Sequence, residues 1–136
     1  MNRNMTRSPV TIAESDYDRL AELIEITRDA LPDISLYMQQ ELDRATIVSQ
    51  ADPASVQMGS SVRFIDHGSG KVHEIRLVYP VDSSLADGRL SVLTPVGSAL
   101  LGQQAGSTAL CRSPGGQVRP LTVVSVTPPA DARAAP

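Results

Sequence analysis

The stretch from Leu90 to Gly106 constrains the fold more than any other part of this chain. It reads as a short strand, then a helix of roughly two turns, then a tight exit. Thr94 is a good N-cap because its hydroxyl accepts from the free N–H groups of the first turn, and Pro95 suits the first helical position. Gly102 offers the left-handed conformation that commonly ends a helix. Because so short a helix cannot persist alone, we expect a sheet to clasp it.

Composition limits the classes of function. The 136 residues are the usual size of one domain, or of a compact domain with a small appendage. One Phe, three Tyr and no Trp leave the core to aliphatic side chains. A net charge of −3 lacks the basic footprint of a protein that binds duplex nucleic acid. No apolar run approaches the roughly 18 residues that span a membrane. The start of the chain has no signal-peptide core, and Cys111 has no partner for a disulfide. We expect a cytoplasmic protein that contacts neither membranes nor specific nucleic-acid sequences.

The first third of the chain has helical periodicity. Residues 1–10 are polar and are expected to form a disordered tail. Residues 11–49 are expected to hold a short helical hairpin, after an extended lead-in at Thr11–Ala13. Ser15 is the expected N-cap of the first helix, which should run to about Ala30.

A second helix follows at once. The segment Leu31–Asp33 breaks the first helix, and Ile34 opens the next. Two helices of about 14 residues joined by a few residues form an antiparallel coiled-coil hairpin. The expected apolar face of the second helix is Met38, Leu42, Ala45 and Val48, with Leu36 and Ile47 on its flanks.

Beyond a linker at residues 50–57 the period becomes alternating, so we expect a sheet domain over residues 58–127. The expected strands are Ser61–Asp66, Val72–Tyr79, Arg89–Leu93, Ser107–Arg112 and Val118–Val126, with turns at His67–Gly70 and Ser113–Gly116 and a loop at Pro80–Gly88. Pro120 interrupts the last run, which predicts an edge strand or a bulge. Residues 128–136 are Pro-rich and expected to be disordered. The fold class is α+β: a helical hairpin in front of an antiparallel sheet that clasps one short helix.

These residues also carry a resemblance. The run Thr94–Gly102, with Gly106 and the turn Pro114–Gly116, is similar to the C-terminal domain of the bacterial GreA and GreB transcript-cleavage factors. It resembles the Rnk family, the regulators of nucleoside diphosphate kinase, more closely still, and the run Leu77–Pro80 is also similar. In that family the same domain follows a short helical hairpin. The resemblance covers roughly residues 11–126 and implies an FKBP-like sheet domain.

Several candidate chemical sites lack the residues that their chemistry needs. The segment His67–Lys71 lacks the preceding Gly and the following hydroxyl of a phosphate loop and is interpreted as a hairpin turn. His67, His73 and Cys111 are too few for a zinc site. Ser98 lacks the flanking pattern of a nucleophile elbow. The implied FKBP-like fold raises prolyl isomerisation, but too few aromatic residues are present to line such a pocket. We expect no catalytic residue, no metal and no cofactor.

Asp29 and Asp33 lie at the expected tip of the hairpin. The resemblance raises a cleavage role, because Gre factors carry tip acids that help hold a catalytic metal ion in the polymerase. Helices of about 14 residues reach only about 21 Å. The resemblance implies that the hairpin of the cleavage factors is about twice as long, so this one is expected to be too short to bring the acids to the metal ion. The acids are interpreted as solvated turn residues or as electrostatic contacts to a partner, with a cleavage tip as the alternative.

Binding to a partner is the remaining class of function. The resemblance implies that Thr94, Pro95, Val96 and Gly97 face the rim of the RNA polymerase secondary channel. Pro95 has a preset φ and docks at little ordering cost, although it also serves simply to start the helix. Leu93 departs from the family pattern, since the cleavage factors tend to be polar there. The expected function is non-enzymatic: docking on polymerase in competition with Gre factors, without stimulating cleavage.

Three alternatives stay open. The protein could act directly on nucleoside diphosphate kinase or another protein. It could be a weak Gre-like cleavage factor. Its hairpin could also pair with a second copy as a four-helix dimer, because the apolar stripe must be covered by something.

Overall fold

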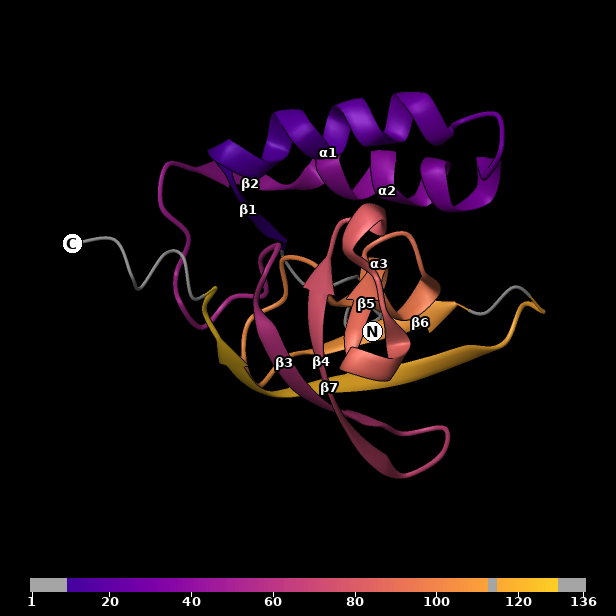
Figure 1. Ribbon diagram of the computed structural model, residues 1–136. Helices are drawn as coiled ribbons and strands as arrows, with labels where there is room; N and C mark the ends of the chain where they lie inside the picture. The colour runs from indigo at the N-terminus through magenta and orange to yellow at the C-terminus, as the bar shows by residue number, and fades with distance from the viewer. Residues whose placement is uncertain (1–9, 113–114, 130–136) are drawn as a thin grey trace, which may run out of the picture.

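The computed structural model describes residues 10–112 and 115–129, and it places a helical hairpin against a curled five-stranded sheet (Figure 1). The elements in chain order are β1 (Thr11–Ala13), α1 (Glu14–Thr27), α2 (Pro32–Arg44), β2 (Thr46–Val48), β3 (Ser61–Asp66), β4 (Lys71–Val78), η2 (Pro80–Asp82), η3 (Leu85–Asp87), β5 (Arg89–Ser91), α3 (Pro95–Leu100), β6 (Thr108–Arg112) and β7 (Val118–Thr127). The predicted α+β class is confirmed. Most of both expected tails and residues 113–114 of the expected turn lie outside the described residues.

The two helices have 14 and 13 residues, as expected, but their ends differ from the prediction. Ser15 is not the N-cap: Ala13 holds that position, and its methyl side chain can cap no N–H group. The helix begins there because β1 runs straight into α1, with the Ala13 N–H bound to the Gln57 side chain. The first helix ends at Thr27 instead of about Ala30. The second begins at Pro32, two residues before the predicted Ile34, since Pro needs no N–H partner in a first turn.

The end of the second predicted helix is wrong. α2 stops at Arg44, and Thr46–Val48 forms strand β2, which pairs in parallel with β1. Ala45, Ile47 and Val48 therefore do not extend the apolar helical face. A run of β-branched residues beside an unpaired strand is more stable extended than helical.

Gln57 joins the base of the hairpin to the sheet domain, although the sequence predicts only a linker here. Its side chain is 7% exposed. Its Oε1 accepts from the N–H of Ala13 at 3.0 Å, and its Nε2 donates to the carbonyl of Thr11 at 2.8 Å. The Thr11 N–H in turn donates to the carbonyl of Gly102 at 3.2 Å. The side-chain amide of Gln57 thus makes the two hydrogen bonds that a neighbouring strand would make to β1. Together with the Thr11–Gly102 bond, it fixes β1 against the segment that follows α3.

The large sheet has the order β5-β4-β3-β7-β6, and every pairing except the parallel β4–β5 is antiparallel. β7 lies between β3 and β6, so the edge prediction for Pro120 is wrong. The Pro120 carbonyl accepts from the His67 N–H at 3.0 Å, just past the end of β3. Because a strand residue directs N–H and C=O to the same side, the missing donor faces that turn and breaks no bond to β6. A bulge does occur in β7, but opposite Arg63 and Phe64 of β3.

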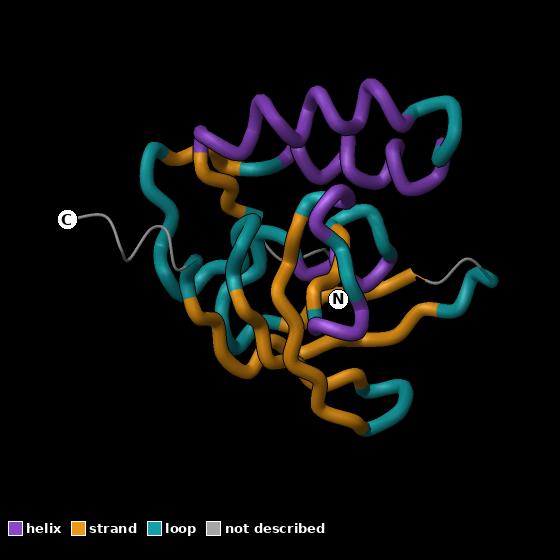
Figure 2. The backbone as a smooth tube through the Cα atoms, in the orientation of Figure 1, coloured by secondary structure: helices purple, strands orange, loops and turns teal. Residues whose placement is uncertain are grey.

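The hairpin and the sheet share one hydrophobic core, and Figure 2 shows the two helices of the hairpin side by side along one end of the strands. Burying one large aliphatic side chain in this core contributes about 1.5–3 kcal/mol to folding stability. The hairpin stripe is therefore covered within the chain, which removes the main argument for a four-helix dimer. The fully buried members of the core include Leu20, Ile24, Met38 and Leu42 from the hairpin and Val62, Leu77, Val92, Leu100 and Leu121 from the sheet domain.

Candidate functional site

The turn before α3 is held by a relay of hydrogen bonds. The N–H of Gly97 donates to Thr94 Oγ1 at 3.0 Å, which confirms the predicted cap. The Thr94 hydroxyl donates in turn to the carbonyl of Ser91 at 2.8 Å. Pro95 sits in the first turn of the helix with its φ preset. One threonine side chain therefore ties the end of β5 to the first turn of α3 and makes the turn rigid.

Position 97 needs a glycine for a steric reason that the sequence alone does not reveal. A Cβ on this residue would overlap the carbonyl oxygen of Ser91 and press on Thr94 Oγ1. Gly97 is buried, whereas Thr94, Pro95 and Val96 are half-buried. Gly97 therefore packs under the turn and is not itself available for contact, whereas Thr94, Pro95 and Val96 reach the surface. Gly102, at the other end of α3, has the expected positive φ of 78°.

A groove of about 520 Å³ lies between this turn and the tip of the helical hairpin. Figure 1 shows α3 directly below α2, with the hairpin tip and the end of β6 on the same side. One wall consists of residues 30–34 with Tyr37, and the other of Leu93, Pro95 and Ser98, with Arg112 at the rim. The lining is mainly apolar. Of the predicted contact residues, Pro95 and Asp33 line this groove. The others, Thr94, Val96, Gly97 and Asp29, do not line it.

The two predicted acids occupy different positions at this groove. Asp33 lines it, whereas Asp29 is exposed on the loop before it. The neighbouring cation Arg28 is ion-paired with Glu25. Within the described residues, no group of three or more His, Cys, Asp or Glu side chains is arranged to hold a metal ion. The hairpin therefore ends beside the Pro95 turn, on the other side of the same groove.

Sequence reasoning missed the groove itself. Ile34 and Tyr37 line it, although the sequence predicts only that they belong to a helix. Leu93 also lines it, and its apolar character is the one signal that could have indicated an apolar surface here. No local pattern shows that the hairpin folds back over α3, because that depends on contacts between distant segments.

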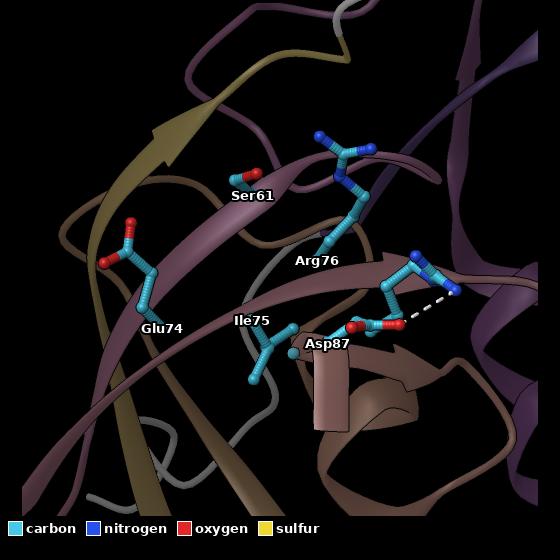
Figure 3. Close-up of a pocket in the computed structure, with 7 residues that line it drawn as sticks. Ser61, Glu74, Ile75, Arg76 and Asp87 are labelled. Carbon is cyan, nitrogen blue, oxygen red and sulfur yellow. Dashed lines mark ion pairs between the residues drawn. The ribbon is translucent and has the colours of Figure 1, made fainter. Parts of the chain in front are cut away.

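A second pocket, of about 370 Å³, lies where β4 meets β5 (Figure 3). It is lined by acidic and basic side chains together, among them Glu74, Arg76, Asp87 and Arg89. Arg89 pairs with Asp87 at 3.5 Å. No residue of the predicted contact set lies in it, and its mixed charges favour no particular ligand.

The other candidate residues have structural roles. His67 Nε2 lies 2.8 Å from Thr122 Oγ1, and the His73 ring stacks on Phe64 with 5.4 Å between centroids. Cys111 is buried in the core, and burial raises the pKa of its thiol, so it is a poor nucleophile. No helix in the described part of the chain is both long and apolar enough to cross a bilayer.

A polar contact joins the start of α1 to the sheet domain. The Tyr79 hydroxyl donates to Asp16 Oδ1 at 3.2 Å, and the Arg19 guanidinium lies 3.8 Å from the centre of the Tyr79 ring. Burial raises the pKa of both groups, and it outweighs the lowering that Arg19 and the hydrogen bonds cause at Asp16. Tyr79 therefore stays protonated and remains a donor to Asp16.

The raised pKa of Asp16 predicts a pH dependence. The folded state holds this proton more tightly than the unfolded chain, so the contribution of Asp16 to stability is complete below pH 3.8 and decreases as pH rises through the raised pKa. Asp16→Asn does not titrate. Its free energy of unfolding should therefore improve relative to the parent protein as pH rises from about 3 to about 7, measured by urea denaturation. A flat or opposite trend would contradict the raised pKa.

Comparison with known proteins shows to which family the chain belongs. Residues 50–128 match the model of the GreA/GreB transcription elongation factor C-terminal family, and residues 8–48 match that of the Rnk N-terminus. The "Regulator of nucleoside diphosphate kinase" of Escherichia coli (strain K12) is 34% identical over 124 residues, which cover 90% of this chain and 91% of that relative. A GreA from Thermodesulfovibrio yellowstonii is 32% identical over 79 residues, 57% of this chain and 50% of that protein.

A solved structure agrees with these matches. The prokaryotic transcription elongation factor GreA/GreB from Nitrosomonas europaea superposes with a TM-score of 0.69 at 36% identity, covering 87% of this chain and 98% of that one. The relatives named here are regulators and elongation factors. The chain is therefore a member of the Rnk family of nucleoside diphosphate kinase regulators, and its sheet domain is of the GreA/GreB C-terminal type.

Proposed function

We propose that this protein binds RNA polymerase at the rim of the secondary channel through Thr94, Pro95 and Val96, and that it competes there with Gre factors without stimulating transcript cleavage. The observation that carries the proposal is the rigid turn held by the Ser91–Thr94–Gly97 relay. A surface fixed before binding loses little conformational entropy on docking. Membership of a family with a Gre-type sheet domain supplies the class of partner.

The short hairpin favours a protein that occupies the polymerase channel over one that stimulates transcript cleavage. A helix of 14 residues extends about 21 Å. The hairpin also lies back along the sheet domain, with its tip beside the Pro95 turn (Figure 1). A protein docked by that turn would keep Asp29 and Asp33 near its docking surface, away from a metal ion deep in the enzyme.

Pro95→Glu tests the docking surface. A charge in the contact should weaken binding to core RNA polymerase at least about tenfold, a change that one disrupted central contact commonly causes. The fold should persist, because an acidic residue in the first turn of a helix is favourable. Binding is measured by pull-down and by biolayer interferometry, with thermal unfolding as the check on folding.

Val81→Glu is the matched control for Pro95→Glu. It adds the same charge at a side chain that is 83% exposed and lies outside the groove. It should bind polymerase as the parent protein does. Undiminished binding by a folded Pro95→Glu variant would remove the docking proposal.

The second candidate function is direct action on nucleoside diphosphate kinase, which the name of the Escherichia coli relative favours. Purified kinase and this protein should then form a complex in the absence of polymerase, and kinase activity should change on mixing. A kinase unaffected by a saturating excess of the protein would leave an indirect effect through transcription.

A further inference from the structure

The groove described above has two walls, and only one of them belongs to the sheet domain. The other is the tip of the hairpin, where Leu31 is 43% exposed and Pro32 and Tyr37 add apolar surface. Leu93 and Pro95 face them from the sheet side. Together these side chains make the lining of the groove mainly apolar, and a contiguous apolar patch of this kind commonly marks a contact site.

The charges at the groove are arranged unevenly. Asp33 lines the hairpin wall and Asp29 is exposed just before it, while the adjacent Arg28 is already paired with Glu25. A cation, Arg112, lies on the opposite, sheet-side rim. A partner segment would therefore meet negative charge on the hairpin side and positive charge on the sheet side.

We infer that the hairpin tip is a second docking wall, and that the groove takes a segment of the polymerase that places an apolar side chain between Leu31 and Pro95 and a lysine or arginine beside Asp33. This inference rests on the proposed function and specifies the chemistry of its partner. It also gives the acidic tip a role that needs no metal ion. The hairpin tip then contributes to the recognition of RNA polymerase and does not extend into its active centre.

Leu31→Ser tests the apolar part. Leu31 is the N-cap of α2 and makes no side-chain cap bond, and serine is a preferred N-cap, so this variant should fold at least as well as the parent protein. Its affinity for core RNA polymerase should fall about tenfold, as expected when a buried contact residue is truncated. Leu85→Ser is the control, because Leu85 is 80% exposed and lies outside the groove. Its affinity should not change.

Asp33→Asn tests the electrostatic part. Affinity should fall about threefold to tenfold at low ionic strength, and the difference from the parent protein should shrink in about 0.5 M salt, where screening is strong. Asp18→Asn is the control: it makes the same change of charge in the first turns of α1, away from the groove. Equal losses in both variants would indicate only a general effect of net charge and would overturn this part of the inference.

The two levels of the proposal fail separately. If Leu31→Ser and Asp33→Asn bind as the parent protein does while Pro95→Glu does not bind, the hairpin is not a docking wall and the proposed function stands. If a folded Pro95→Glu variant binds normally, the proposed function itself fails. Weakened binding in all three variants, with their three controls unchanged, supports the two-walled groove.

Discussion

A Gly97→Ala variant is expected to lose about 3 kcal/mol of its free energy of unfolding, at the upper end of the cost of overpacking. The added Cβ would meet the carbonyl oxygen of Ser91, which is backbone and cannot rotate away as a side chain does. It would also press on Thr94 Oγ1, which accepts the hydrogen bond from the Gly97 N–H. Relief requires α3 to move away from β5, and this movement displaces Pro95. Urea denaturation measures the loss, and polymerase binding of the folded fraction should fall with it.

Gly115→Ala is the matched control for this glycine. A Cβ at Gly115 meets no atom within 4 Å, so its free energy of unfolding should stay within about 0.5 kcal/mol of the parent value. A Gly97→Ala variant that is as stable as the parent protein would show that the Ser91 backbone yields easily. The rigid turn at the centre of the proposed docking surface would then be wrong.

Gln57→Leu is the second substitution with a large expected effect. Leucine fills most of the space but leaves the Ala13 N–H and the Thr11 carbonyl without their partner. The two backbone groups belong to half-buried residues, and a buried group that loses its partner costs about 1–3 kcal/mol, so a total loss of about 3 kcal/mol is expected. The damage should concentrate at the base of the hairpin, because both groups belong to β1. Urea denaturation gives the size, and amide hydrogen exchange at Ala13 gives the place.

Gln40→Leu makes the same chemical change at an exposed position on α2 and should alter stability by no more than about 0.5 kcal/mol. Slow exchange of the Ala13 amide in Gln57→Leu would mean that the buried glutamine does not hold β1. The hairpin would then be attached to the sheet by apolar packing alone.

Local chemistry explains which features could be predicted from the sequence. The cap at Thr94, the position of Pro95 and the exit at Gly102 depend on backbone preferences of a few neighbouring residues, and the structure confirms them. The hairpin of β3 and β4 also follows from alternation and turn residues. These signals act within a few residues of the element that they define.

The errors arise where distant segments compete with local preference. Val48 continues the helical spacing of Met38 and Leu42, yet it pairs with Ala13 of a strand formed much earlier in the chain. Pro120 looks like an edge residue, yet it fits inside the sheet because its missing donor faces the end of β3. The same limit hid the groove, since its walls come from parts of the chain that no local pattern connects.

We propose that this protein occupies the polymerase secondary channel without supplying a catalytic carboxylate. The most direct measurement is a transcript-cleavage assay on stalled elongation complexes, with this protein added alone and then together with a Gre factor. Alone it should leave the rate of cleavage unchanged, and with increasing dose it should suppress the cleavage that the Gre factor stimulates. Stimulation of cleavage that is lost in the Asp29→Asn, Asp33→Asn double variant would contradict the account.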